Sequence, residues 1–248
     1  MIRFFRKLRI ELIKKNQVRR YFLYAIGEVF LVVVGILIAL QIDTWNEARK
    51  DRRTEQEIIG NLRQEFLANQ TELDSTLVVV AKNRDANLKL MEFFGKPAEA
   101  LQRVNLDSIV FFSVEYQRFI PSQNALTDLI QSGGLQLITN QDLKDALYDW
   151  TRVMGLIDET YSGVKQKTED DIIPFLTPRY PLKDIDRFGG LGWKEPSRLP
   201  TNKYALFSEI AYESLVDDYL YRLLRYENNL KKGRSLIQKI LRIIENNP

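Results

Sequence analysis

The feature that most constrains this chain is an apolar run of 22 residues close to its N-terminus. Residues 21–42 read YFLYAIGEVFLVVVGILIALQI, and Glu28 is the only charged residue among them. As an α-helix rising 1.5 Å per residue, the run is about 33 Å long, which matches a hydrocarbon core of roughly 30 Å. Val29–Leu40 is apolar on every face, whereas a helix in a soluble protein normally keeps a polar face. We therefore predict a transmembrane helix over residues 21–42.

A cleaved signal peptide is the main alternative for this run, and the sequence disfavours it. A signal peptide has a shorter apolar region and needs small residues at the positions −3 and −1 before the cleavage site. Residues 36–42 offer no such pair. We therefore expect an uncleaved anchor.

A basic tail precedes the apolar run and predicts its orientation. Residues 1–20 contain eight basic residues and a single acid, Glu11, whereas both signs mix in residues 43–53. Lys and Arg next to a span are retained in the cytoplasm. We expect a single-pass protein of an inner (cytoplasmic) membrane, with its N-terminus cytoplasmic and its C-terminal domain periplasmic. Arg19, Arg20 and Trp45 are the expected anchors at the two interfaces. The tail either lies along the inner leaflet or acts only as a topogenic signal, and the sequence leaves both open.

Composition removes several classes of function. The chain has no cysteine and no histidine, which excludes thiolate nucleophiles, zinc–sulfur sites and every Ser-His-Asp or His-metal arrangement. An enzyme of this composition would have to use carboxylates, a Ser-Lys pair or tyrosines as its catalytic groups, and the sequence contains no recognisable motif of that kind. The positive charge sits on the short tail and the rest of the chain is slightly acidic, which argues against a nucleic-acid partner. We expect no enzyme and no cofactor.

Beyond the span the pattern predicts a mainly α fold. Residues 43–95 contain no proline and repeat apolar positions every three or four residues, which indicates a long amphipathic helix. We favour the first helix of a bundle over a coiled coil, because Asn69 and Arg84 interrupt the stripe. Residues 96–248 should complete an irregular helical bundle, with a proline- and glycine-rich loop at 174–203.

Local signals divide this outer domain further. Residues 107–112 fit either a strand or a buried helix. Helices are expected over 122–131, from a capping box at Thr139 to about residue 173, and from about Tyr204 onward, the last with a kink or break at Gly233. Tyrosines of the last helix are expected to pack in the bundle, and the loop aromatics Tyr180, Phe188 and Trp193 to attach the loop to it. The acids of 169–171 and 184–186 lack the spacing of a calcium loop and should be solvated.

Two stretches carry a resemblance. YAIGEVFLVVVGILIALQIDTWNEARK, residues 24–50, and PSQNALTDLIQSGGLQLITNQDLKDAL, residues 121–147, resemble an uncharacterised single-span inner-membrane family of Gram-negative bacteria. That family pairs a basic N-terminus with an IGE–apolar–GILIALQI–WNE pattern. The resemblance implies the same topology and brings no activity with it.

Glu28 is the most informative single residue. A carboxylate within a span costs roughly 2.5 kcal/mol or more at its centre, so it normally has a role. Glu28, Gly35 and Ala39 share one helix face, and Gly35 and Ala39 form a small-x-x-x-small pair. We expect this face to contact a second membrane helix. A proton-linked group, a protonated Glu, or a Glu paired to Arg19 or Arg20 remain the alternatives.

Together these patterns predict a membrane-anchored periplasmic interaction or scaffold module within a membrane assembly. Its expected partners are the lipid bilayer and either further copies of itself or another inner-membrane protein. The alternative is an accessory subunit of an ion-driven inner-membrane machine that uses Glu28, by architectural analogy with single-span stator proteins. A ligand sensor ranks lower, because the cytoplasmic tail is too short for an output domain.

Overall fold

The computed structural model describes residues 18–246, except for the side chains of Val18, Arg20, Tyr21 and Tyr24. The predictions made for residues 1–17 of the basic tail lie outside the described residues. The described part is mainly helical and contains no strand, as the sequence predicts. Its principal helices are α2 (Val18–Met91), α4 (Leu106–Val114), α5 (Asn124–Gln131), α6 (Gln141–Gln166), α7 (Ile173–Leu176), α8 (Leu182–Asp186) and α9 (Ile210–Glu245).

The chain divides into two compact units, the first ending at Glu57 and the second beginning at Ile58, and α2 contributes to both. In the first unit, no described side chain between Phe22 and Ile42 is buried. The large apolar side chains there are 46–72% exposed, except that of Val34, which is half-buried. Among the described residues, α2 is the one helix long and apolar enough to cross a membrane.

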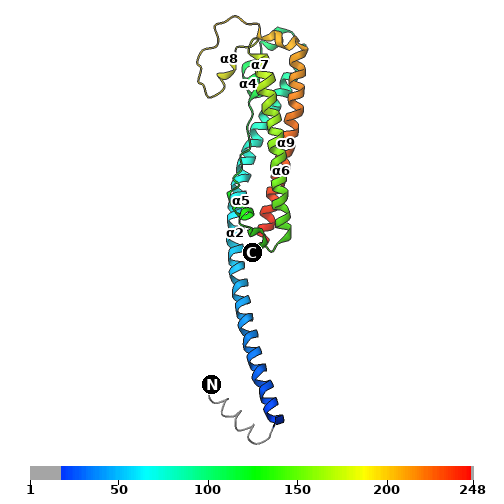
Figure 1. Ribbon diagram of the computed structural model, residues 1–248. Helices are drawn as coiled ribbons and strands as arrows, with labels where there is room; N and C mark the ends of the chain where they lie inside the picture. The colour runs from blue at the N-terminus through cyan, green and yellow to red at the C-terminus, as the bar shows by residue number, and fades with distance from the viewer. Residues whose placement is uncertain (1–17, 247–248) are drawn as a thin grey trace. The chain divides into compact units, whose positions relative to one another are not determined.

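The second unit has its own core, in which α6 and α9 run side by side along the second part of α2 (Figure 1). The part of α2 in this unit presents a buried stripe whose spacing alternates between four and three residues. The stripe consists of Leu62, Phe66, Asn69, Leu73, Thr76, Val80, Asn83, Asn87 and Leu90, each at most 2% exposed. Trp150 of α6 packs near the start of this stripe, with its ring centre 5.3 Å from that of Phe66 and 6.4 Å from that of Phe119. Burying a side chain of this size stabilises a fold by roughly 1.5–3 kcal/mol.

Three helix boundaries differ from the sequence prediction. The last helix, expected from about Tyr204, begins at Ile210 after a short 3-10 helix, η3 (Lys203–Ser208). The expected capping box at Thr139 is wrong: the N-cap of α6 is Asn140, whose side-chain oxygen accepts from the backbone N–H of Leu143 at 2.9 Å. After α6 the chain passes through a π-helical stretch, η2 (Lys167–Ile172), into α7, so helix continues to Leu176 rather than ending near residue 173. Pro174 lies in the first turn of α7, directly after the π-helical stretch.

The predicted break at Gly233 is also wrong, because α9 is continuous from Ile210 to Glu245. Gly233 is buried against α6. A Cβ at this position would lie 3.0 Å from Cδ1 of Ile157 and 3.8 Å from Cγ1 of Val153. The glycine therefore lets α6 and α9 approach closely and does not interrupt the helix.

The segment between α2 and α6 settles the strand-or-helix ambiguity in favour of helix. α4 begins after an Asn105 cap, whose side chain accepts from the N–H of Ser108 at 3.2 Å. The chain then has no regular secondary structure from Glu115 to Gln123. α5 ends at Gln131, two residues before Gly133, where φ is +72°. A positive φ suits glycine because it has no Cβ to clash with the backbone.

Candidate membrane and interaction surfaces

The face of Glu28, Gly35 and Ala39 lies on the apolar part of α2. Glu28 is half-buried, whereas Gly35 and Ala39 are exposed. A Cβ added at Gly35 would meet nothing within 4 Å in the described structure, so the fold of this chain does not itself require a glycine there. Ala39 lines a shallow depression together with Ile36, Leu40 and Trp45. Gly35 and Ala39 are thus accessible to another helix.

The expected anchors lie at the ends of the same segment. Arg19 is exposed, and the side chain of Arg20 lies outside the described residues. Trp45 is 62% exposed, and the guanidinium of Arg49, one turn later, lies 6.0 Å from the centre of its ring. An amphipathic indole beside a cation is the usual composition of a membrane–water interface.

Two polar residues of α2 hold the start of α5. The side-chain amide of Asn69 donates to the carbonyl oxygen of Ser122 at 2.8 Å and its oxygen accepts from the Ser122 N–H at 2.7 Å. The carboxylate of Glu65 accepts from the N–H groups of Ala125 and Leu126 at 2.7 and 3.3 Å. Because the first N–H groups of a helix have no partner within it, Glu65 caps α5 from a different helix.

A second pair on α2 holds the end of α4. Asn83 donates to carbonyl oxygens of Phe112, Ser113 and Glu115, and its own oxygen accepts from the Tyr219 hydroxyl at 3.1 Å. Asn87 donates to the carbonyl of Ser113 at 2.8 Å. Burial raises the pKa of Tyr219 to about 12, so its hydroxyl stays protonated as a donor. The last carbonyls of α4 are thus satisfied by side chains from α2.

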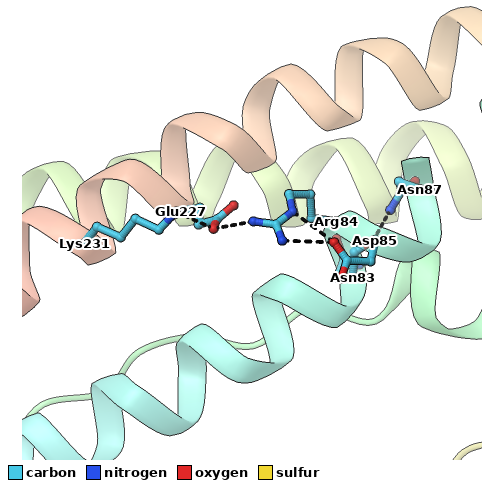
Figure 2. Close-up of polar contacts among 6 residues, drawn as sticks. All are labelled: Asn83, Arg84, Asp85, Asn87, Glu227 and Lys231. Carbon is cyan, nitrogen blue, oxygen red and sulfur yellow. Dashed lines mark hydrogen bonds and ion pairs between the residues drawn. The ribbon is translucent and has the colours of Figure 1, made fainter. Parts of the chain in front are cut away.

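A charged cluster joins α2 to α9 (Figure 2). Glu227 is almost fully buried, and one of its carboxylate oxygens lies 2.7 Å from both Nη1 of Arg84 and Nζ of Lys231. Arg84 also pairs with Asp85 at 3.0 Å. Two cations therefore compensate one buried carboxylate, which is the condition under which a buried charge is tolerated.

The sequence contained a signal for these contacts that our prediction treated as an interruption. Asn69, Asn83 and Asn87 keep the spacing of the apolar stripe, and Arg84 lies beside it. Polar residues that keep the period of a buried face normally have buried hydrogen-bond partners. Sequence alone could not name those partners, because they lie tens of residues away. They are backbone groups in and after α4 and side chains of α9.

The end of α6 carries another ion-pair cluster. Nζ of Lys167 lies 2.8 Å from carboxylate oxygens of both Asp171 and Asp218. Burial lowers the pKa of Lys167, but the hydrogen bonds to Asp171 and Asp218 outweigh it and the net pKa is raised. The hydrogen bond from Lys167 lowers the pKa of Asp218 against the opposing effect of burial, and Arg222 adds to the lowering. Glu169 accepts from the Tyr116 hydroxyl at 2.6 Å. Within residues 18–246, no group of three or more acids is placed to hold a metal ion.

The loop between α7 and α9 is attached at its base and exposed at its tip. Tyr180 is buried, and its hydroxyl donates to Asp107 of α4 at 2.6 Å. Asp184 is also buried and accepts from the N–H of Ser197, so the expectation that this acid is solvated is wrong. Trp193 and Leu199 are 48% and 76% exposed. Of the three loop aromatics, Tyr180 is buried and bonded to α4 as predicted, whereas Phe188 and Trp193 are 39% and 48% exposed.

Tyrosines of α9 mostly pack inward, as expected. Tyr212, Tyr219 and Tyr226 are at most 1% exposed, whereas Tyr221 is 64% exposed. The Tyr226 hydroxyl donates to the carbonyl of Gln117 at 2.9 Å. Tyr219, Tyr226 and the α2 side chains described above bond mainly to backbone and to one another, which is the pattern of groups that hold a fold together. The Tyr212 hydroxyl, by contrast, is buried without a hydrogen-bond partner among the described residues.

Comparison with known proteins adds one finding. No curated protein and no solved structure matches this chain. Residues 28–149, from Glu28 in the apolar part of α2 to Asp149 in α6, match the model of a family of unknown function (DUF6090), and this stretch is therefore similar to that family.

Proposed function

We propose that this protein is a membrane-anchored interaction or scaffold module that acts within a membrane assembly. The observation that carries the proposal is the contrast between its two units. The first presents an apolar helix whose described side chains from Phe22 to Ile42 are unburied, and the second buries its own core. An apolar surface of that length is stable only in lipid or against other apolar helices.

The proposed placement follows from charge. Eight basic residues precede the span, so the N-terminus lies in the cytoplasm and the second unit in the periplasm of an inner membrane. The resemblance to a Gram-negative family supports the same placement. Reporter fusions after Trp45 and after Pro248 test it, and both should be active only in the periplasm. Cytoplasmic activity at either position would overturn the orientation.

The proposed partners are further copies of the chain or another inner-membrane protein. Residues 43–57 between the span and the bundle carry Trp45 and Ala48 as their only apolar side chains. A helix without an apolar stripe forms no coiled coil. The first unit therefore associates with a partner helix through the face formed by Glu28, Gly35 and Ala39. Purification of the intact protein in mild detergent, with identification of what accompanies it, tests the proposal: a stable homo-oligomer or a defined complex supports it, and a monodisperse monomer from its native host contradicts it.

Glu28 favours a second candidate, an accessory subunit of an ion-driven membrane machine. It is a carboxylate within an otherwise apolar run, and such residues commonly serve ion or proton pathways. The two candidates differ in whether Glu28 must titrate, and substitution by glutamine separates them, as argued below.

A further inference from the structure

One open surface of the second unit has the chemistry of a protein-binding groove. It lies between α6 and α9 and encloses about 640 Å³. The buried Val153 and the half-buried Leu156 and Leu236 form its apolar base. Grooves of this kind between paired helices accept the apolar face of another helix.

The rim of the groove is basic, although Lys231 also lies 2.7 Å from the buried carboxylate of Glu227. Arg152 lies on the α6 side and Lys231, Lys232 and Lys239 lie on the α9 side, and all four are exposed. Asp149 is the single acid of the lining, and it lies 2.9 Å from Arg152. Cations on both walls of an apolar base call for an occupant whose apolar stripe is flanked by acids, because complementary charge steers association and disfavours wrong partners.

The length of the groove limits the occupant. On α9 the lining extends from Asn228 to Lys239, which is about 16 Å at 1.5 Å per residue. That is about three helical turns, so a helix of roughly 11–12 residues covers it. A sugar or nucleotide polymer would leave the apolar base uncovered.

We propose that the α6–α9 groove docks an acidic amphipathic helix of a partner protein. This inference rests on the proposed role as an interaction module and names the surface outside the span through which it acts. Contacts of the span and of the groove are separate, so each can be removed without the other.

The first test uses the intact protein in nanodiscs of zwitterionic lipid. The probe is a fluorescent peptide of roughly 18 residues with a leucine stripe flanked by glutamates, and the matched peptide has lysine at every glutamate. Fluorescence anisotropy should show that the acidic peptide binds at least about tenfold more tightly than the lysine peptide. The affinity for the acidic peptide should fall by about tenfold in a Lys232→Glu, Lys239→Glu double variant. The control is a double variant that changes two exposed lysines of α2 outside the groove, Lys82→Glu, Lys89→Glu. Its affinity for the acidic peptide should stay within about twofold of that of the unmodified protein. Equal affinity for both peptides, or equal loss in both variants, would overturn the proposal.

The second test places a photo-crosslinking residue at Ser235, which lines the groove, in intact native cells. The expected product is a crosslink to a protein segment with acids flanking an apolar stripe, absent in the Lys232→Glu, Lys239→Glu variant. Crosslinks to lipid alone would overturn the proposal. If a complex co-purifies unchanged with that variant, the groove proposal is wrong but the proposed function is not contradicted. If the intact protein has no partner at all, the proposed function itself is wrong.

Discussion

Substitutions at Glu28 and Gly35 test different properties of the span. A carboxylate at position 28 is costly within a membrane, whereas no contact within the chain itself requires a glycine at position 35. A helix–helix hydrogen bond in a membrane is typically worth ~0.6 kcal/mol, and a glutamine at position 28 still offers a donor and an acceptor. A Cβ at Gly35 meets nothing within 4 Å. Any loss of association caused by a larger residue there would therefore reflect contact with another molecule.

We predict that Glu28→Gln preserves most of the association of the span, and that Glu28→Leu weakens it. Gly35→Leu should weaken it further by holding the helices apart. Gly27→Leu is the matched control: a Cβ at Gly27 also meets nothing within 4 Å, but the residue points about 100° away from the Glu28 face. Crosslinking or co-purification measures association, together with a phenotype in the native host. A Glu28→Gln complex that assembles but is inactive would favour the ion-driven alternative, because an amide cannot titrate.

Asp218 supplies a pH dependence whose sign follows from its pKa. A lowered pKa in the folded state contributes stability above the ordinary value near 4, and that contribution is lost as the pH falls below it. We predict that Asp218→Asn lowers stability at pH 7 by about 1 kcal/mol or less, because the carboxylate is 40% exposed. The fall in melting temperature between pH 7 and pH 3 should become smaller. Asp217→Asn, an exposed neighbour, is the control. An unchanged pH profile in Asp218→Asn would show that the Lys167–Asp218 ion pair does not cause the pH dependence of stability.

At the scale of elements, the α6–α9 contact depends on one position without a side chain. A Cβ at Gly233 of α9 would lie 3.0 Å from Ile157 of α6, which is closer than ordinary van der Waals contact. Gly155 of α6 is exposed and has open space around it. A larger side chain therefore fits at Gly155 but not at Gly233, although sequence patterns predict that either glycine weakens its helix.

We predict that Gly233→Leu destabilises the protein by about 1–3 kcal/mol, because the added atoms overpack the α6–α9 contact. Gly155→Leu should leave stability unchanged or raise it by up to ~1 kcal/mol, since leucine favours helix over glycine. Thermal unfolding of the intact protein in mild detergent, followed by its helical circular dichroism, compares the two. Equal destabilisation by both substitutions would mean that close packing at Gly233 is not the reason for the glycine.

At the scale of the whole molecule, the second unit should fold without the first. Its core draws on α2, α4, α6 and α9, and the polar contacts of Glu65, Asn69, Asn83 and Arg84 all lie within it. We predict that a fragment from Asp51 to Pro248 is soluble and strongly helical, and unfolds cooperatively. Circular dichroism and a urea titration measure this. A coil-like spectrum, or aggregation relieved only by detergent, would show that the bundle depends on the span.

Periodicity alone predicted the principal long helices of this protein and the segment apolar enough to cross a membrane, but it left residues 107–112 open between strand and helix. These properties depend on residues close in sequence, whose spacing and charge can be read directly. The helix of residues 122–131 and the irregular loop after α7 were predictable for the same reason. Only the tertiary structure decided what Asn69, Asn83, Arg84 and Gly233 do, because their partners lie on segments tens of residues away. The α6–α9 groove was equally invisible in the sequence, since its base and its basic rim come from two helices that meet only in the folded chain.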